Sequence, residues 1–157
     1  MKPIVLATDG SITAAAAATT AIDLAATLDA PLVALSVWDT PYTGLGYAPV
    51  PAALDVAGGS EERAKDAVAT VSAHARKRGV RVETVVARGF PVDEICRVAQ
   101  DHDARLIVVG SHGWGPIRRM LFGSVSTGVL HRATCPVLIV PARDDLPAKP
   151  KQLLTEV

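Results

Sequence analysis

Short apolar runs alternate with helix-like segments along most of the chain. The runs are Ile4–Thr8, Leu32–Val37, Val80–Ala87, Arg105–Val109 and Pro136–Val140. Between them lie Thr13–Leu28, a segment from Ser60 to Gly79, Val92–Asp101 and Ser124–Ala133, in which apolar residues recur at helical spacing. Strands that alternate with helices pair in parallel through right-handed crossovers. The order therefore predicts an α/β fold: an open, doubly wound five-stranded parallel sheet with helices on both faces.

The same patterns predict the details of several elements. Ser11 or Thr13 is expected to cap the first helix, and Ser60 the second. The run Val80–Ala87 alternates between apolar and polar residues, which is typical of a strand near a sheet edge. The expected apolar stripes of the second and third helices are Ala64, Ala67, Val68, Val71 and Ala75, and Ile95, Val98 and Ala99.

Two segments lack such periodicity. Residues 38–59 are rich in proline and glycine and are predicted to form a long loop. Residues 143–157 carry charges and prolines and are predicted to be a flexible tail. We therefore expect one domain over residues 1–142.

Charge and hydropathy exclude several classes of function. Sixteen basic and sixteen acidic residues give a formal net charge of zero, so we expect no nucleic acid as partner. No apolar run approaches the roughly 20 residues of a membrane span, and the N-terminus does not read as a signal peptide. These features predict a cytoplasmic protein without membrane contact. Cys96 and Cys135 form no metal-binding motif and are expected to be buried.

The sharpest motif follows the fourth predicted strand. Gly110 and Gly113 are followed, after nine residues, by Gly123 and Ser124 at the start of a helix. Glycine allows close approach of a ligand, and the N–H groups of such a turn and of a helix N-terminus bind anions. The hydroxyls of Ser124 and Ser126 can add donors. The simpler alternative is a strand–helix connection that uses glycine only to turn.

Nothing in the residues alone indicates catalysis. Asp9 follows the first strand, but no general base is positioned beside it by the sequence. His112, in the glycine-rich loop, is interpreted as a polar loop residue. Binding is therefore favoured over turnover.

From Lys2 to about Pro141 the chain resembles the universal stress protein family. Its ATP-binding members carry G-x2-G-x9-G-(S/T), which matches Gly110, Gly113, Gly123 and Ser124. The stretches that carry the likeness are Ala7-Thr8-Asp9-Gly10-Ser11, Val108–Gly113, Leu121–Ser126 and Cys135–Val140. The resemblance implies an adenine nucleotide alpha hydrolase-like fold and a stress-response protein regulated by ATP.

The resemblance also implies roles for individual residues. Asp9 would face the ribose or a phosphate-bound Mg²⁺, Val37 would present backbone groups to adenine, and Gly110 would lie under the ribose. Gly113, Gly123, Ser124 and Val125 would cradle phosphates, and Ala7 and Thr8 would line the wall. Ser111, His112 and Ser126 complete the predicted nucleotide-binding set.

Several alternatives remain open within the family. Trp114 and Pro116 depart from many relatives in the loop. Some relatives prefer cyclic AMP, a slow ATPase is conceivable, and a branch without the glycine motif forms dimers that bind no nucleotide. Family members pair through the last strand across a two-fold axis, so Pro136–Val140 is the predicted homodimer contact.

Overall fold

The predicted alternation of strands and helices is present in the protein. A computed structural model describes residues 1–38, 61–111 and 123–141. The elements in these residues are β1 (Ile4–Ala7), α1 (Ile12–Thr27), β2 (Leu32–Trp38), α2 (Glu61–Lys77), β3 (Val82–Arg88), α3 (Pro91–Asp101), β4 (Leu106–Gly110), α4 (Ser124–Arg132) and β5 (Val137–Val140). The predicted cap Ser60, the tail 143–157 and the loop after Trp38 lie outside the described residues.

The five strands form one parallel sheet in the order β3-β2-β1-β4-β5. The fold class is therefore confirmed. The edge position expected for Val80–Ala87 is also confirmed, although the strand begins at Val82. Val80 is not part of the strand because its N–H donates to the carbonyl of Ala75 and so closes the end of α2.

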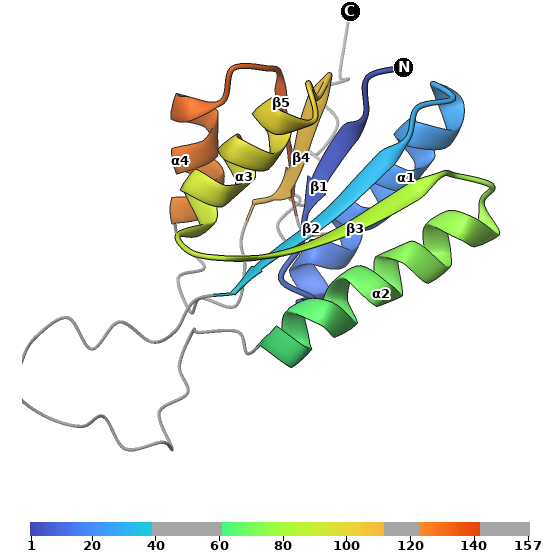
Figure 1. Ribbon diagram of the computed structural model, residues 1–157, viewed down its shortest axis with the longest axis horizontal. Coiled ribbons are helices and arrows are strands. Elements are labelled where there is room, and N and C mark those ends of the chain that lie inside the picture. Colours follow the sequence, from blue (N-terminus) through green and yellow to red (C-terminus); the bar gives the residue numbers. More distant parts are fainter. Residues whose placement is uncertain (39–60, 112–122, 142–157) are drawn as a thin grey trace, which may run out of the picture.

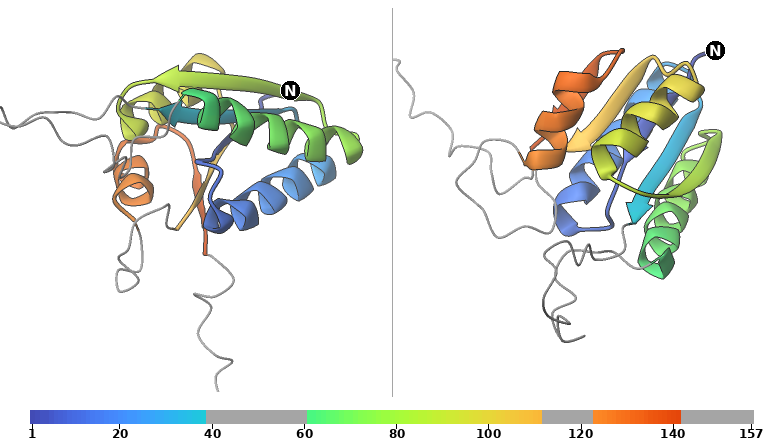
Figure 2. Two further views of the ribbon diagram at one scale, coloured as in Figure 1. Left: turned by 90° about the horizontal axis from the view of Figure 1, so that it is seen from below. Right: turned by 60° about the vertical axis from the view of Figure 1, so that its left-hand side comes forward.

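Each face of the sheet carries its own core. Side chains alternate along a strand, so Leu6 and Val108 pack with α1 and α2, whereas Val5 and Ile107 pack with α3 and α4. Figures 1 and 2 show one helix pair on each side of the sheet. The stripes predicted for α2 and α3 are buried in these cores.

The start of α1 is set by Ser11. Its hydroxyl accepts a hydrogen bond from the N–H of Ala14 at 3.1 Å, which is the N-cap arrangement. Of the two caps that the sequence offered, the structure therefore selects Ser11. Behind the cap, Ala17, Ala21 and Ala25 are buried, and their small side chains let α1 approach the sheet closely.

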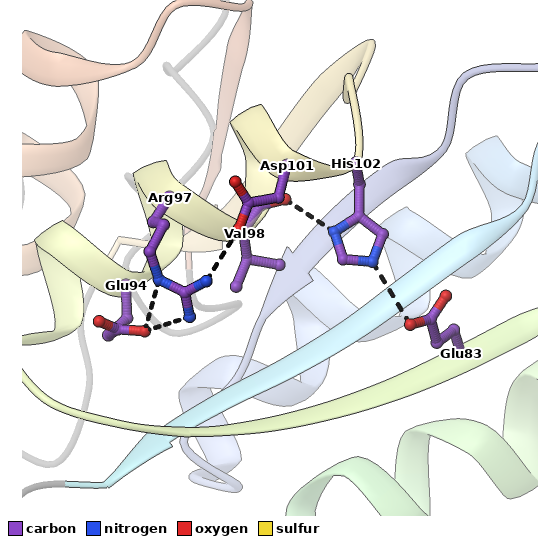
Figure 3. Close-up of polar contacts among 6 residues, drawn as sticks. All are labelled: Glu83, Glu94, Arg97, Val98, Asp101 and His102. Atoms are coloured by element: carbon purple, nitrogen blue, oxygen red, sulfur yellow. Dashed lines mark hydrogen bonds and ion pairs between the residues drawn. The ribbon is translucent and has the colours of Figure 1, made fainter.

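A polar network covers the outer side of α3 (Figure 3). Arg97 bridges Glu94 and Asp101 on the same helix. His102, at the end of α3, bonds the carbonyl of Val98 through Nδ1 and lies 3.3 Å from Glu83 Oε1 on the edge strand β3. Exposed ion pairs stabilise a fold only slightly, so these contacts add little to the stability of the packing between α3 and the sheet.

The helices α3 and α4 approach each other most closely at Gly128. A Cβ atom added there would lie 2.7 Å from Cγ2 of Val92, nearer than side-chain carbons approach. One turn further on, Arg132 of α4 pairs with Asp93 of α3. Gly128 is therefore required by packing, since its φ does not demand glycine.

Replacing Gly128 by alanine tests this contact. Overpacking a core costs about 1–3 kcal/mol, whereas alanine favours a helix over glycine by about 1 kcal/mol. We expect Gly128→Ala to lower the free energy of unfolding in the natural chain and to raise it in a Val92→Ala background. Urea denaturation of the four proteins of the cycle measures both effects. An equal effect of Gly128→Ala in the two backgrounds would contradict the proposed clash.

The turn after β1 packs against α2. Gly10 has φ +74°, and a Cβ atom on it would lie 3.2 Å from the Cβ atom of Ala67. Gly79 has nearly the same conformation, with φ +72°, but an added Cβ atom there would meet nothing within 4 Å. The two glycines thus share a backbone requirement and differ in their surroundings.

This difference predicts unequal losses for two alanine substitutions. Left-handed backbone costs a residue with a Cβ atom about 1–2 kcal/mol, so Gly79→Ala and Gly10→Ala should both lower the melting temperature. Gly10→Ala should lose about 1 kcal/mol more, because Ala67 is fixed on its helix and has to give way. Thermal and chemical unfolding of both variants provide the comparison. Equal losses would show that Ala67 does not restrict the turn.

Candidate functional site

The winding of the chain reverses between β1 and β4. The chain moves in one direction across the sheet when it passes from β1 through α1 to β2. It moves in the opposite direction when it passes from β4 through α4 to β5. The helices α1 and α4 also cover opposite faces. The two connections diverge at the carboxyl ends of β1 and β4, and this is where open α/β sheets bind their ligands.

The turn from β1 into α1 lies beside this switch point, where the strand order predicts a ligand-binding crevice. Asp9 is exposed, and its Oδ1 accepts a hydrogen bond from the N–H of Ser11 at 2.9 Å. Thr8 is buried, and its hydroxyl oxygen accepts from the N–H of Gly10 at 3.2 Å. These short-range bonds hold the Asp9 carboxylate at the carboxyl end of β1.

Two strand ends direct main-chain groups toward the crevice. Successive residues of a strand point their N–H and C=O groups to opposite neighbours. The carbonyl of Leu35 accepts from Thr8 on the β1 side, and that of Trp38 accepts from Gly89 on the β3 side. Val37 therefore points its N–H and C=O toward β1, two residues beyond the last β1–β2 pair.

Gly110 is placed in the same way from the opposite side. Ser111 donates its N–H to the carbonyl of Val140 on β5, so the main-chain groups of Gly110 point toward β1. The last β1–β4 pair joins Leu6 to Val108, so Gly110 too lies beyond the paired region. The crevice is thus lined by polar main-chain groups from β2 and β4.

The end of β4 and the start of α4 are joined directly. Gly123 donates its N–H to the carbonyl of Ser111 at 2.6 Å. The buried hydroxyl of Ser126 lies 3.3 Å from that carbonyl oxygen and 3.0 Å from the carbonyl oxygen of Gly123, and the two acceptors share its single hydrogen. These contacts fix the first turn of α4 beside the carboxyl end of β4.

The first turn of α4 presents donors rather than a cap. Its N-cap residue is Gly123, which has no side chain that could accept from the N–H groups of the turn. Ser124 and Val125 are exposed there. A helix N-terminus of this kind carries a partial positive charge and can hold an anion.

The structure brings most of the predicted site residues to one edge of the sheet. Thr8, Asp9, Val37, Gly110, Ser111 and Gly123–Ser126 lie there, whereas His112 and Gly113 are outside the described residues. Two side chains are used inside the protein: that of Ala7 packs on the α3–α4 core, and the Ser126 hydroxyl holds the β4–α4 junction. Sequence reasoning missed the contact between Gly10 and Ala67, since a helical stripe does not reveal its partner.

The cysteines do not provide an activated nucleophile. Both are partly exposed, not fully buried as expected. Burial nevertheless raises the pKa of the Cys96 and Cys135 thiols, and the charge of the other cysteine adds to this rise at Cys135. A raised pKa reduces the thiolate fraction at neutral pH. Within residues 1–38, 61–111 and 123–141, no three His, Cys, Asp or Glu side chains are grouped to hold a metal ion.

A cavity of about 330 Å³ lies at the opposite edge of the sheet. It is lined by residues at the amino ends of β1, β4 and β5, among them Lys2, Arg105 and Pro136, and by the end of α3. Ligands of open α/β sheets bind at the carboxyl edge. We therefore place the candidate functional site at the winding reversal and not in this cavity. In the described part of the chain, no helix has the length and apolar character needed to cross a membrane.

Two solved structures share this architecture and contain nucleotides. A universal stress protein in complex with cAMP is 25% identical, covers 90% of this chain and 97% of its own, and superposes with a TM-score of 0.67. The universal stress protein from Archaeoglobus fulgidus in complex with dAMP is 26% identical, with coverages of 89% and 98% and a TM-score of 0.60.

The sequence comparisons point the same way. Residues 1–141 match the model of the universal stress protein family. Universal stress protein MJ0531 of Methanocaldococcus jannaschii is 36% identical over 141 residues, which cover 88% of this chain and 81% of the relative. The chain therefore belongs to the universal stress protein family.

Proposed function

We propose that this protein binds an adenine nucleotide, with ATP favoured, in the crevice between the β1–α1 turn and the start of α4. The observation that carries the proposal is the first turn of α4, which has glycine as its N-cap and is held against the end of β4 by the Ser111–Gly123 and Ser126 hydrogen bonds. Such a turn suits a phosphate group. The relatives with bound cAMP and dAMP support the adenine nucleotide class.

The geometry suggests how the ligand would lie. Val37 directs main-chain groups to the crevice from β2 and would bond the edge of adenine. The ribose would lie over Gly110, near the exposed carboxylate of Asp9. The phosphates would extend to the N–H groups of Ser124 and Val125, and Gly113 would join them as the family motif implies.

A magnesium ion fits this arrangement only together with the phosphates. Asp9 supplies an exposed carboxylate at the crevice, and the described residues offer no group of three ligating side chains. Mg²⁺ commonly combines one or two carboxylates with substrate phosphates and water. Asp9 would therefore face a phosphate-bound ion, whose chemistry would be to neutralise phosphate charge.

The biological role that we propose is nucleotide-dependent regulation of a stress response in the cytoplasm. The reasons are the family, the start of α4 that we propose binds phosphate, and the sequence, which places no general base beside Asp9. We also propose a homodimer through the last strand. This strand, β5, lies at the sheet edge opposite β3, and its apolar side chains are half-buried.

Substitutions at Ser124 test the phosphate cradle. Proline is tolerated at the first position of a helix, and the extended conformation of Gly123 (φ −72°, ψ 166°) suits the residue before proline. Ser124→Pro should therefore keep α4 while removing one N–H and the hydroxyl. Hydrogen bonds to charged groups contribute about 1.5–3 kcal/mol, so the Kd for ATP with magnesium should rise about ten-fold or more.

The matched control is Ser124→Ala, which removes the hydroxyl alone and should weaken binding less than the proline. Calorimetric titration gives the affinities, and thermal unfolding without ligand checks that both variants fold. Unchanged ATP affinity in Ser124→Pro would contradict the cradle. The proposed function would be contradicted if the unmodified protein did not bind ATP at millimolar concentration and carried no nucleotide after purification.

Two further measurements separate the alternatives. In a competition between ATP and cyclic AMP, displacement of ATP by low concentrations of cyclic AMP would favour the cyclic nucleotide as ligand. Phosphate release by the unmodified protein above that of Gly113→Ala would indicate a slow ATPase. Equal release by the two proteins would indicate that the site binds ATP without hydrolysing it.

A further inference from the structure

Two contacts define the side of α2 that faces α1. Ala67 lies against Gly10, at the turn into α1. Arg78, just after the end of α2, pairs with Asp23 on α1, with 2.8 Å between Nη2 and Oδ1. The flank that carries Ala67 therefore faces α1 and the β1–α1 turn.

Arg63 lies on this flank, one helical turn before Ala67. At about 100° per residue, the two positions differ by about 40° around the helix axis. Side chains on a helix lean toward its N-terminus, which for α2 is the end at the carboxyl edge of the sheet. Figure 1 shows the first turns of α1 and α2 at that edge, beside the end of β2. The Cα–Cβ bond of Arg63 therefore points past Gly10 toward the crevice, and the side chain is exposed.

The position of α2 decides which part of a ligand Arg63 can reach. The helix packs on β2 and β3, on the face of the sheet opposite α4. The phosphate donors belong to α4, whereas the end of β2 carries Val37, the proposed adenine contact. Arg63 is therefore on the nucleoside side of the crevice.

The charges around Arg63 agree with this assignment. Glu61 and Glu62 occupy the same first turn of α2, and Glu61 pairs with Lys65 at 2.6 Å. Lys65 neutralises Glu61, and Glu62 offsets the charge of Arg63, so the side chains of this turn offer no net positive charge to a polyphosphate. A base and a ribose carry no charge and are compatible with this turn.

We propose that Arg63 contacts the nucleoside part of the bound nucleotide and contributes to the choice of ligand. This inference rests on the proposed nucleotide site. The planar guanidinium can lie against a base or bond a ribose hydroxyl. Arg63 is not without a partner in the structure, and stacking through the flat face leaves its N–H edges for other contacts.

Arg63→Ala tests the assignment with ATP, ADP and AMP, which share a nucleoside and differ in phosphate number. A nucleoside contact predicts the same loss for all three, about three- to ten-fold in Kd. The matched control is Arg76→Ala, which removes the same charge from the last turn of α2, at the far edge of the sheet. Calorimetric titration of the natural protein and both variants measures the affinities.

The outcomes separate this inference from the proposed function. Equal losses for the three nucleotides in Arg63→Ala, with Arg76→Ala unchanged, would support the contact. A loss that grows with phosphate number would assign Arg63 to the phosphates and overturn it. If Arg63→Ala bound the nucleotides with unchanged affinity, or if both variants lost the same affinity, the Arg63 contact would be overturned. The proposed nucleotide site would stand in either case. If the natural protein bound none of the three, the proposed function would fail and the inference with it.

Discussion

The reversal of winding at the centre of the sheet is the constraint on which the site depends. Parallel strands need crossover connections, and these crossovers have one hand. A chain that moves outward from β1 to β2 and β3, and then returns to place β4 on the other side of β1, must put α1 and α4 on opposite faces. From the carboxyl edge of the sheet, the first turns of these two helices therefore diverge to opposite faces. The position of the crevice between them therefore follows from the strand order and does not depend on which side chains line it.

Much of this fold could be predicted from the sequence because its elements have strong local patterns. Apolar runs and helical stripes located the strands and helices of the described residues to within about two residues, and the alternation in Val80–Ala87 indicated an edge. Contacts between elements were less accessible. In the sequence, Gly128 is simply a residue of low helix propensity within a predicted helix. Only its proximity to Val92 explains why glycine is needed there. The start of β3 at Val82 likewise depends on a bond from Val80 to Ala75 that no periodicity records.

For the site, the residue types and their place at strand ends were predictable, and their individual use was less so. Because carboxyl ends of parallel strands meet at one edge, Asp9, Val37 and Gly110 could be grouped in advance. The direction of the Val37 main chain required the register with β1 and β3. The hydroxyl of Ser126 could be expected to point outward to a ligand, yet its acceptors are the carbonyls of Ser111 and Gly123. Main-chain acceptors leave no trace in a residue pattern.

The hydrogen bond from Gly123 to Ser111 separates the stability of the fold from the binding of a ligand. It pins together the two ends of the segment 112–122, and Ser126 reinforces the closure. Closing a loop of twice the length costs only about 0.6 kcal/mol more, so the fold itself places little demand on the length of the chain between Ser111 and Gly123. Substitutions between Ser111 and Gly123, at Gly113 among others, are therefore expected to change ligand binding more than the stability of the sheet.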